Sequence, residues 1–210
     1  MMFKNRKYNL TGKKWLIIGD SITDKRHHPT TKKYHDYISE KTGCKVLDYG
    51  VSGTGFTVKE SFLERLQRTP LDVDYITVFG GTNDFRLGNK PLGMCQDRNN
   101  ESFYGSLHLF FQALIKKYPT KQLSAVTPLP RWRKNEGDWN SKGETLKQYA
   151  EAIQEVTGFY GIPCKDMFSE GGIYAKNPVF ISTFMPDGLH PNSQGHQYFH
   201  NKILTFLEGL

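Results

Sequence analysis

Short apolar runs alternate with longer segments of helical periodicity along this chain, and this alternation constrains the fold more than any other feature. Four runs read as β-strands, at residues 15–19, 46–49, 75–79 and 123–127. Helices are predicted between them and after them, at residues 34–41, 58–67, 102–118 and 144–160. A last helix is expected beyond Pro191, with Asn192 or Ser193 as its N-cap. Strands that alternate with helices in this way form a parallel sheet covered by helices, so the sequence predicts an α/β fold.

The length and the composition are those of one globular domain. The 210 residues, 37% of them hydrophobic, are expected to form a single domain over residues 1–210, with residues 1–13 as an N-terminal extension. No stretch approaches the roughly 18 consecutive apolar residues of a membrane span. Because the N-terminus is basic and has no apolar core typical of a secretory signal, we expect a cytoplasmic protein without a membrane span.

The charge of the chain is unevenly distributed. The formal net charge is +7, and the whole excess lies in the first 45 residues, where 11 basic residues stand against 4 acidic ones. Such a region is either a solvated face or a surface that attracts an anionic partner. No helix-turn-helix, zinc-finger or ribonucleoprotein motif accompanies it, so no nucleic-acid partner is expected. The sequence makes no prediction about the oligomeric state.

Motifs for metals and cofactors are not evident. The three cysteines, at positions 44, 95 and 164, are far apart and predict neither a disulfide framework nor a zinc site. His196 and His200 are four residues apart and His27 and His28 are adjacent, but no third ligand has a suitable spacing, so these are expected to be surface or helix-face histidines. Phosphate-binding and dinucleotide-binding glycine motifs are also missing. We therefore expect no metal and no cofactor.

Two long segments lie outside the strand and helix pattern, at residues 85–100 and 128–143, and both follow predicted strands. In open α/β sheets, ligands bind at the carboxyl ends of the strands, so both segments are expected to be binding loops. The second contains Arg131 and Trp132, which could stack on a sugar ring or hold an anionic group. The alternative is that the aromatic residues of this loop only pin it to the domain.

A candidate nucleophile and its base are found near opposite ends of the chain. Ser21 follows the first predicted strand within a Gly-Asp-Ser turn, where its hydroxyl can project into a crevice. Asp187 and His190 are three residues apart in a loop bounded by glycine and proline, so the carboxylate can hold the second nitrogen of the imidazole. Each residue alone is as well explained by a turn or a helix cap. Together they have the residue types that a nucleophilic serine requires.

Two glycine-containing turns after neighbouring strands can supply donors to an oxyanion. Gly53 has an unobstructed backbone N–H, and Asn83 has a side-chain amide. The alternative is a turn glycine and a turn-forming asparagine. The backbone N–H of Ser21 would be the third donor.

The order of these blocks resembles the SGNH hydrolases, also called the GDSL esterase/lipase family. The blocks are Gly-Asp-Ser, Ser-Gly, Gly-Thr-Asn-Asp and Asp-x-x-His-Pro, and they extend from Gly19 to Asn192. The sequence departs from the family at Ile22, where leucine is usual, and at Asp48, where asparagine is frequent. The resemblance implies a three-layer α/β/α sandwich around a five-stranded parallel sheet.

By this resemblance, Ser21, His190 and Asp187 form a catalytic triad, and Ser21, Gly53 and Asn83 form the oxyanion hole. The implied activity is a cofactor-free serine esterase that cleaves short acyl groups, for example acetyl, from carbohydrates or other polar alcohols. One alternative is a lysophospholipase or thioesterase with the same triad. Another is a catalytically silent module that binds carbohydrate or anions, although such a module has no need for the complete set of residues.

Overall fold

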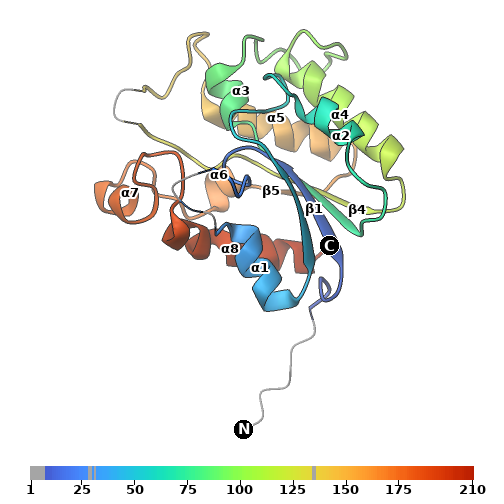
Figure 1. Cartoon of the computed structure of the whole chain (residues 1–210). Helices are drawn as coiled ribbons and strands as arrows, with labels where there is room; N and C mark the ends of the chain where they lie inside the picture. The colour runs from blue at the N-terminus through green and yellow to red at the C-terminus, as the bar shows by residue number, and fades with distance from the viewer. Residues whose placement is uncertain (1–7, 28–29, 31, 134–135) are drawn as a thin grey trace.

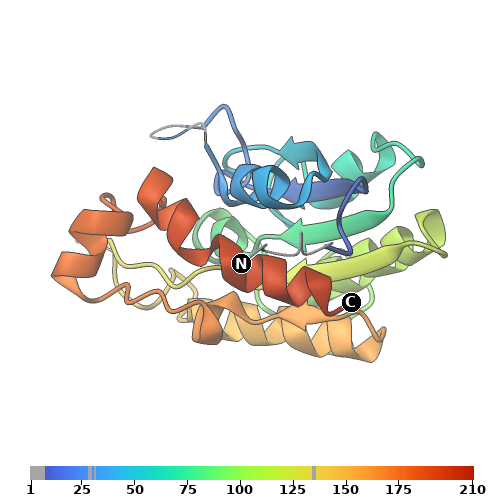
Figure 2. The same cartoon turned by 90° about the horizontal axis from the view of Figure 1, so that it is seen from below.

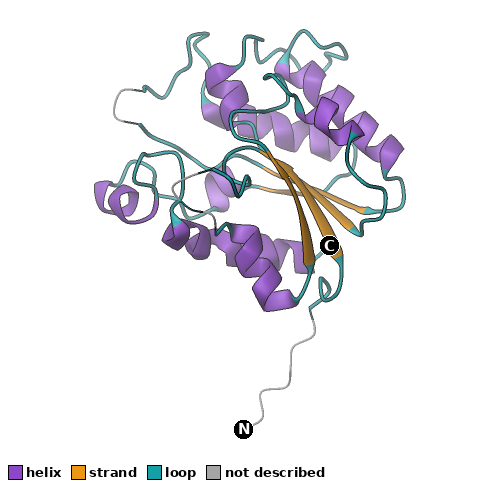
Figure 3. Cartoon of the chain, in the orientation of Figure 1, coloured by secondary structure: helices purple, strands orange, loops and turns teal. Residues whose placement is uncertain are grey.

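A computed structural model describes residues 8–27, 30, 32–133 and 136–210. A five-stranded sheet lies at its centre, and every pair of neighbouring strands is parallel (Figures 1 and 3). The strand order is β2-β1-β3-β4-β5. The strands are β1 (Lys14–Gly19), β2 (Lys45–Gly50), β3 (Tyr75–Phe79), β4 (Gln122–Val126) and β5 (Cys164–Lys165). The predicted α/β fold with a five-stranded parallel sheet is confirmed.

Helices cover both faces of the sheet, as Figure 1 shows, with α1 and α8 on one face and α2, α4 and α5 on the other. Seen from below, α8 lies across the strands (Figure 2). The helices are α1 (Tyr34–Thr42), α2 (Phe62–Gln67), α3 (Thr82–Leu87), α4 (Phe103–Lys117), α5 (Leu146–Phe159), α6 (Met167–Glu170), α7 (Pro178–Phe184) and α8 (Ser193–Glu208). N-cap Asn192 begins α8 by accepting a hydrogen bond from the Gly195 N–H at 2.9 Å.

The alternation of side chains along β1 produces two hydrophobic cores. Leu16 and Ile18 point to the face covered by α4 and α5, whereas Trp15 and Ile17 point to the face covered by α1 and α8. All four side chains are fully buried. A central parallel strand is apolar on both faces because both faces are covered by helices. The packing on both sides of β1 fixes the position of its carboxyl end, which Ser21 follows.

Two segments differ from the prediction, and a third agrees with it. The helix expected over residues 58–67 begins only at Phe62, because Ser61 caps it together with Glu64 and because Glu60 has a φ of 54° that no helix allows. The loop expected at residues 85–100 is helical at its start, since α3 extends to Leu87. In the described residues of the segment 128–143, regular structure is limited to Trp139, which forms an isolated bridge with Thr145 beyond the segment, as expected of a loop.

Residues 8–13 pack against the end of the last helix. Leu10 is fully buried, and the Asn9 and Leu10 N–H groups donate to the Glu208 carboxylate at 2.8 and 3.1 Å. Residues 1–7 of the expected N-terminal extension lie outside the described residues. In the described part of the chain, every helix is too short or too polar to cross a membrane.

Candidate active site

Three neighbouring strands end at the same level and bring three turns together. Gly19 at the end of β1 is in register with Gly50 at the end of β2 and with Phe79 at the end of β3. Ser21 follows the first strand, Gly53 the second and Asn83 the third. The carboxyl edge of the sheet therefore holds all three residues that the sequence predicts for the oxyanion hole.

The turn after β1 is organised by Asp20. Its Oδ1 accepts the Ile22 N–H at 2.9 Å, and its backbone carbonyl accepts the Asp24 N–H at 2.9 Å. The carboxyl is almost completely buried, and this desolvation raises its pKa to about 6. These two hydrogen bonds join Asp20, which precedes Ser21, to residues that follow it. They hold the serine at the end of the strand with only 3% of its surface exposed.

Ser21, His190 and Asp187 form a continuous chain of contacts. Ser21 Oγ lies 3.0 Å from His190 Nε2, and His190 Nδ1 lies 2.7 Å from Asp187 Oδ2. Ser21 and His190 are separated by 169 positions in the sequence, and the fold brings them within hydrogen-bond distance. An ionised Asp187 can only accept, so the Nδ1–H of His190 donates to it and Nε2 is left to accept the Ser21 hydroxyl proton.

The Asp187 carboxylate is strongly stabilised as an anion. Its Oδ1 accepts the backbone N–H groups of Leu189 and His190 at 3.0 and 2.7 Å. Its Oδ2 accepts from Arg133 Nη2 at 2.8 Å in addition to the His190 ring. These hydrogen bonds outweigh the partial burial of the group and hold its pKa well below the usual range.

The turn after β2 presents Gly53 in a left-handed conformation. Its φ is +77°, which favours glycine, and nothing lies within 4 Å of the position of a β-carbon. Asp48 supports the turn by accepting the Gly50 N–H at 2.7 Å, and Asp24 accepts the Ser52 N–H at 3.1 Å. The aspartate at position 48 thus provides an acceptor for this turn.

Asn83 lies in the first turn of α3 and is almost fully buried. The sequence offered a turn-forming asparagine as the alternative, but the residue is helical. Its Nδ2 donates to the Thr54 carbonyl at 2.9 Å, which ties the turn after β3 to the turn after β2. One amide hydrogen is used in this contact, so the second can be directed to a substrate.

Arg65 of α2 connects the same turns from beneath and was missed by the sequence analysis. The buried guanidinium donates to the Gly19 carbonyl at 2.7 Å, to the Tyr49 carbonyl at 2.9 Å and to the Thr54 hydroxyl. It thereby links the ends of β1 and β2 to the turn that carries Gly53. Nothing near Arg65 in the sequence indicates this role, because its partners are up to 46 positions away.

Of the histidines expected to be surface or helix-face residues, His196 and His200 lie on α8 as expected, whereas the packing of His27 and the burial of His196 differ from a surface position. The His27 ring packs against the His190 ring with centroids 4.4 Å apart, and its Nδ1 lies 3.0 Å from the Ser52 hydroxyl. His196 is completely buried, and its Nδ1 accepts the Tyr34 N–H at 3.3 Å. Their place in the fold overrides the polar character of the residue type. His28 lies outside the described residues.

The loop after β4 places Arg131 and Trp132 differently. The Arg131 side chain is nearly buried, forms an ion pair with Glu136 and donates to the Thr82 hydroxyl at 3.3 Å. Trp132 is 41% exposed, and its backbone N–H donates to the Gly188 carbonyl at 2.9 Å. Both line a cavity of about 740 Å³ bordered on its far side by residues 174–178. The loop therefore stands between this cavity and the Asp187–His190 turn.

The described residues of the site do not form a metal-binding cluster. Within residues 8–27, 30, 32–133 and 136–210, no cluster of three or more histidine, cysteine, aspartate or glutamate side chains could hold a metal ion.

The sequence matches a model of the GDSL-like Lipase/Acylhydrolase family over residues 17–198. The chain belongs to this family. The match begins in β1 and ends in α8, so it includes the three turns and the Asp187–His190 pair. A GDSL-like acylhydrolase is a hydrolase, as the sequence analysis expects. No curated protein matches the sequence.

Solved structures share the fold over nearly the whole chain. A protein from Lactobacillus plantarum is 28% identical, with a TM-score of 0.88 over 96% of this chain and 99% of its own. A lipase/acylhydrolase from Enterococcus faecalis is 20% identical, with a TM-score of 0.68 over 94% of this chain and 96% of its own. An acetylxylan esterase from Geobacillus stearothermophilus is 18% identical, with a TM-score of 0.65 over 95% of both chains. The two more distant structures show the similarity of the fold alone.

Proposed function

We propose that this GDSL-like acylhydrolase is a serine esterase that removes short acyl groups from carbohydrates or other polar alcohols, with Ser21, His190 and Asp187 as its triad. The observation that carries the proposal is the pair of contacts at His190, 3.0 Å to Ser21 Oγ and 2.7 Å to Asp187 Oδ2. A serine hydroxyl becomes nucleophilic when a base accepts its proton, and the base needs a partner that holds its tautomer. Both requirements are met by this geometry.

In the acylation step, Ser21 Oγ attacks the ester carbonyl carbon while His190 Nε2 accepts the hydroxyl proton. The resulting imidazolium is stabilised by the Asp187 carboxylate. When the tetrahedral intermediate collapses, the imidazolium returns the proton to the leaving alcohol, and the acyl group stays on Ser21.

The carbonyl oxygen becomes an anion in this step, and the donors proposed for it are the N–H groups of Ser21 and Gly53 and the side-chain amide of Asn83. Arg65 and the Asn83–Thr54 hydrogen bond hold the turns together before substrate binds. Donors that are already in place need no reorganisation as the charge develops, which is the main source of their effect on rate.

In the second half of the cycle, water attacks the acyl-enzyme carbonyl and His190 takes its proton. The imidazolium then protonates Ser21 Oγ as the acid is released. The cycle consumes one ester and one water and needs no cofactor.

The loop after β4 separates the cavity beside the site from the Asp187–His190 turn, so a leaving group reaches the cavity only by extending past the loop. Trp132 and Tyr174 line the cavity with 41% and 63% of their surfaces exposed, and charged side chains of Arg133, Glu136 and Lys176 lie on the same walls. Exposed aromatic faces next to hydrogen-bonding groups suit a sugar ring better than an alkyl chain. Phe85, Leu146 and Phe168 line the same cavity, so its lining is compatible with a sugar ring and also with the alkyl chain of the lysophospholipase alternative.

Reaction with a fluorophosphonate probe tests the proposed nucleophile. Mass spectrometry of the wild-type protein should find the phosphonyl group on Ser21, and Ser21→Ala should abolish both labelling and ester hydrolysis while the circular dichroism spectrum is unchanged. The matched control is Ser182→Ala, since that exposed hydroxyl donates only to the Val179 carbonyl of its own helix. An unlabelled Ser21 in the wild type would support the catalytically silent binding module.

A second assay compares p-nitrophenyl esters of increasing chain length with acetylated oligosaccharides. Short acyl chains should be hydrolysed fastest, and Trp132→Ala should reduce catalysis on the oligosaccharide by about 1 to 3 kcal/mol, the scale of one lost stacking surface. Hydrolysis of p-nitrophenyl acetate should be nearly unchanged, because it does not reach the loop. Equal losses on both substrates would assign Trp132 to the structure of the loop, and a preference for long chains would favour the lysophospholipase alternative.

A further inference from the structure

The carboxylate of Asp187 is shared between the His190 ring and a guanidinium from a distant loop. Arg133 Nη2 donates to Oδ2 at 2.8 Å, the same oxygen that lies 2.7 Å from His190 Nδ1. Arg133 Nε also donates to the backbone carbonyl of Asp187, at 3.3 Å. The Asp187 carboxylate has hydrogen-bond donors even without Arg133, since Oδ1 already accepts two backbone N–H groups.

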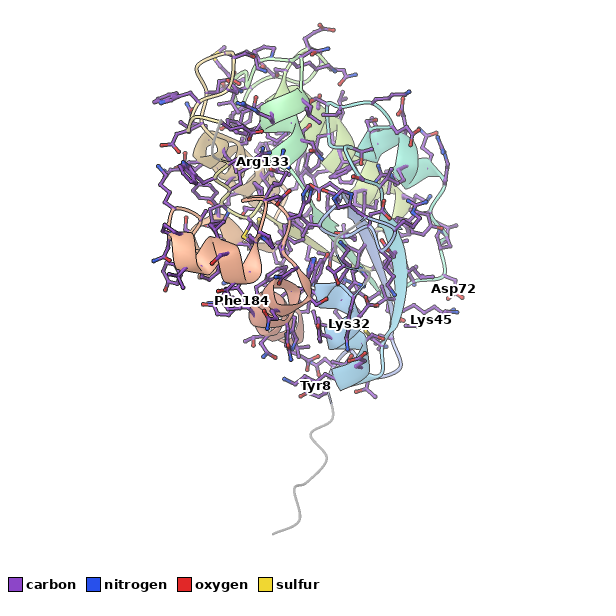
Figure 4. All side chains as sticks on the ribbon, turned by 60° about the vertical axis from the view of Figure 1, so that its left-hand side comes forward. Tyr8, Lys32, Lys45, Asp72, Arg133 and Phe184 are labelled. Atoms are coloured by element: carbon purple, nitrogen blue, oxygen red, sulfur yellow. The ribbon has the colours of Figure 1, made fainter. Side chains whose placement is uncertain are left out.

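The backbone keeps Arg133 against the Asp187 turn. The Trp132 N–H donates to the Gly188 carbonyl, and Gly188 has a φ of +74°. A β-carbon at position 188 would lie 1.9 Å from the Trp132 carbonyl oxygen, so the two segments are in direct contact. The position of Arg133 is therefore fixed by its backbone as well as by the hydrogen bonds of its side chain. Figure 4 labels Arg133 above α7, on the side of the molecule formed by this loop.

We propose that Arg133 is a positioning residue that orients Asp187 toward His190 and keeps the His190 ring neutral, and thus able to accept a proton, down to a lower pH. The role of His190 as the base rests on the proposed function, but the coupling between Arg133 and the His190 ring does not. Arg133 lines the neighbouring cavity and does not touch the reacting atoms, so its effect on the His190 ring passes through Asp187.

The sign of the effect follows from the charges around the ring. The titratable groups around His190 are Asp187 from its own loop, Arg133 from the loop after β4, Asp20 and His27 from the segment after β1, and His196 from α8. Lys33 lies next to them and donates to the Ser21 carbonyl. The two carboxyl groups favour the imidazolium when ionised, and the cations oppose it. Arg133 donates to the same Asp187 oxygen that stabilises the His190 imidazolium. Removing the guanidinium charge leaves the carboxylate to interact with His190 alone, which favours the protonated ring.

The experiment is a histidine-ring NMR titration of the whole protein without substrate. The titration midpoint of the His190 ring is compared in the wild type, R133M and R133Q, which remove the charge, and R133K, which keeps it. The control is K176M, which removes a cation from the same cavity wall whose partner is Asp138 and not Asp187. Having two uncharged variants keeps the test available if one of them does not fold, which near-UV circular dichroism checks.

R133M and R133Q should raise the midpoint by about half a pH unit to one unit, the size expected for a nearby charge that is partly exposed to solvent. R133K should shift it less than half as far, and K176M by less than about 0.2. In ester hydrolysis, the acid limb of kcat should move to higher pH by the same amount in R133M.

Two results separate this inference from the proposed function. A midpoint in R133M and R133Q that moves no further than in K176M overturns the role of Arg133, whatever the activity. An NMR shift of the expected size in a protein that hydrolyses no ester supports the role of Arg133 and contradicts the esterase.

Discussion

Replacing Asp20 with asparagine should change the stability of the protein in a way that depends strongly on pH. The Asp20 carboxyl is buried, and its folded-state pKa is about 6 compared with 3.8 for an exposed aspartate. Between these two values the folded protein binds a proton that the unfolded chain has lost. The folding free energy of the wild type therefore becomes less favourable as the pH rises through this window, and the loss is complete above about pH 6.

The expected magnitude follows from the pKa difference. A difference of roughly two pKa units corresponds to about 3 kcal/mol, which is the cost of ionising Asp20 in the folded protein at neutral pH. Asparagine has nearly the same shape, can still accept the Ile22 N–H and does not ionise. Relative to the wild type, the variant should therefore gain about 3 kcal/mol between about pH 4 and about pH 7.5.

Urea unfolding at several pH values, followed by fluorescence, measures this difference. Contributions from other titrating groups largely cancel, since they are common to both proteins. Asp84 lies close enough to Asp20 to couple with it, and Asp84→Asn serves as the comparison. A stability difference between Asp20→Asn and the wild type that is the same at every pH would refute the reasoning, because it would mean that the folded and unfolded proteins ionise Asp20 alike.

Three other outcomes are expected. Asn83→Ala should lower kcat by roughly 10²- to 10³-fold with little change in KM, the loss typical of one oxyanion donor, and an effect confined to KM would instead make Asn83 a binding residue. Arg65→Met should destabilise the fold by about 3 kcal/mol in urea unfolding, since it removes the buried guanidinium that donates to the Gly19 and Tyr49 carbonyls and to the Thr54 hydroxyl, whereas the exposed Arg68→Met should stay within about 0.5 kcal/mol. Cys164 is half-buried, and desolvation raises the pKa of its thiol to about 12, so it should react with iodoacetamide at about pH 8 at least 100-fold more slowly in the native protein than in urea, as mass spectrometry can measure; comparable rates would contradict the raised pKa.

The sequence alone was sufficient to predict the parallel sheet and the edge of it that holds the residues of the proposed site. Fully apolar runs such as residues 15–19 have to be buried on both faces, and in a parallel sheet their carboxyl ends meet at one edge. Ser21, Gly53 and Asn83 each follow a predicted strand within a few residues, so the spacing in the sequence predicts that they lie near one another.

Short elements were beyond the reach of local patterns. The strand β5 has only two residues, Cys164 and Lys165, and it exists because β4 offers a free edge beside them. The start of α2 at Phe62 was decided by the cap at Ser61, and the helical state of Asn83 by its place at the start of α3. In each case a tertiary contact or a cap decided the outcome over the periodicity of a few residues.

The residues that support the candidate triad were determined only by the tertiary structure. Arg65 lies in a predicted helix, and Arg133 and His27 lie in loops; for a polar residue in either setting, a solvated position is the ordinary expectation. Their partners are distant in the sequence: Arg65 reaches Gly19 across 46 positions, and Arg133 reaches Asp187 across 54. A hydrogen bond between such residues leaves no local pattern, because its geometry is set by the packing of whole strands and loops against one another.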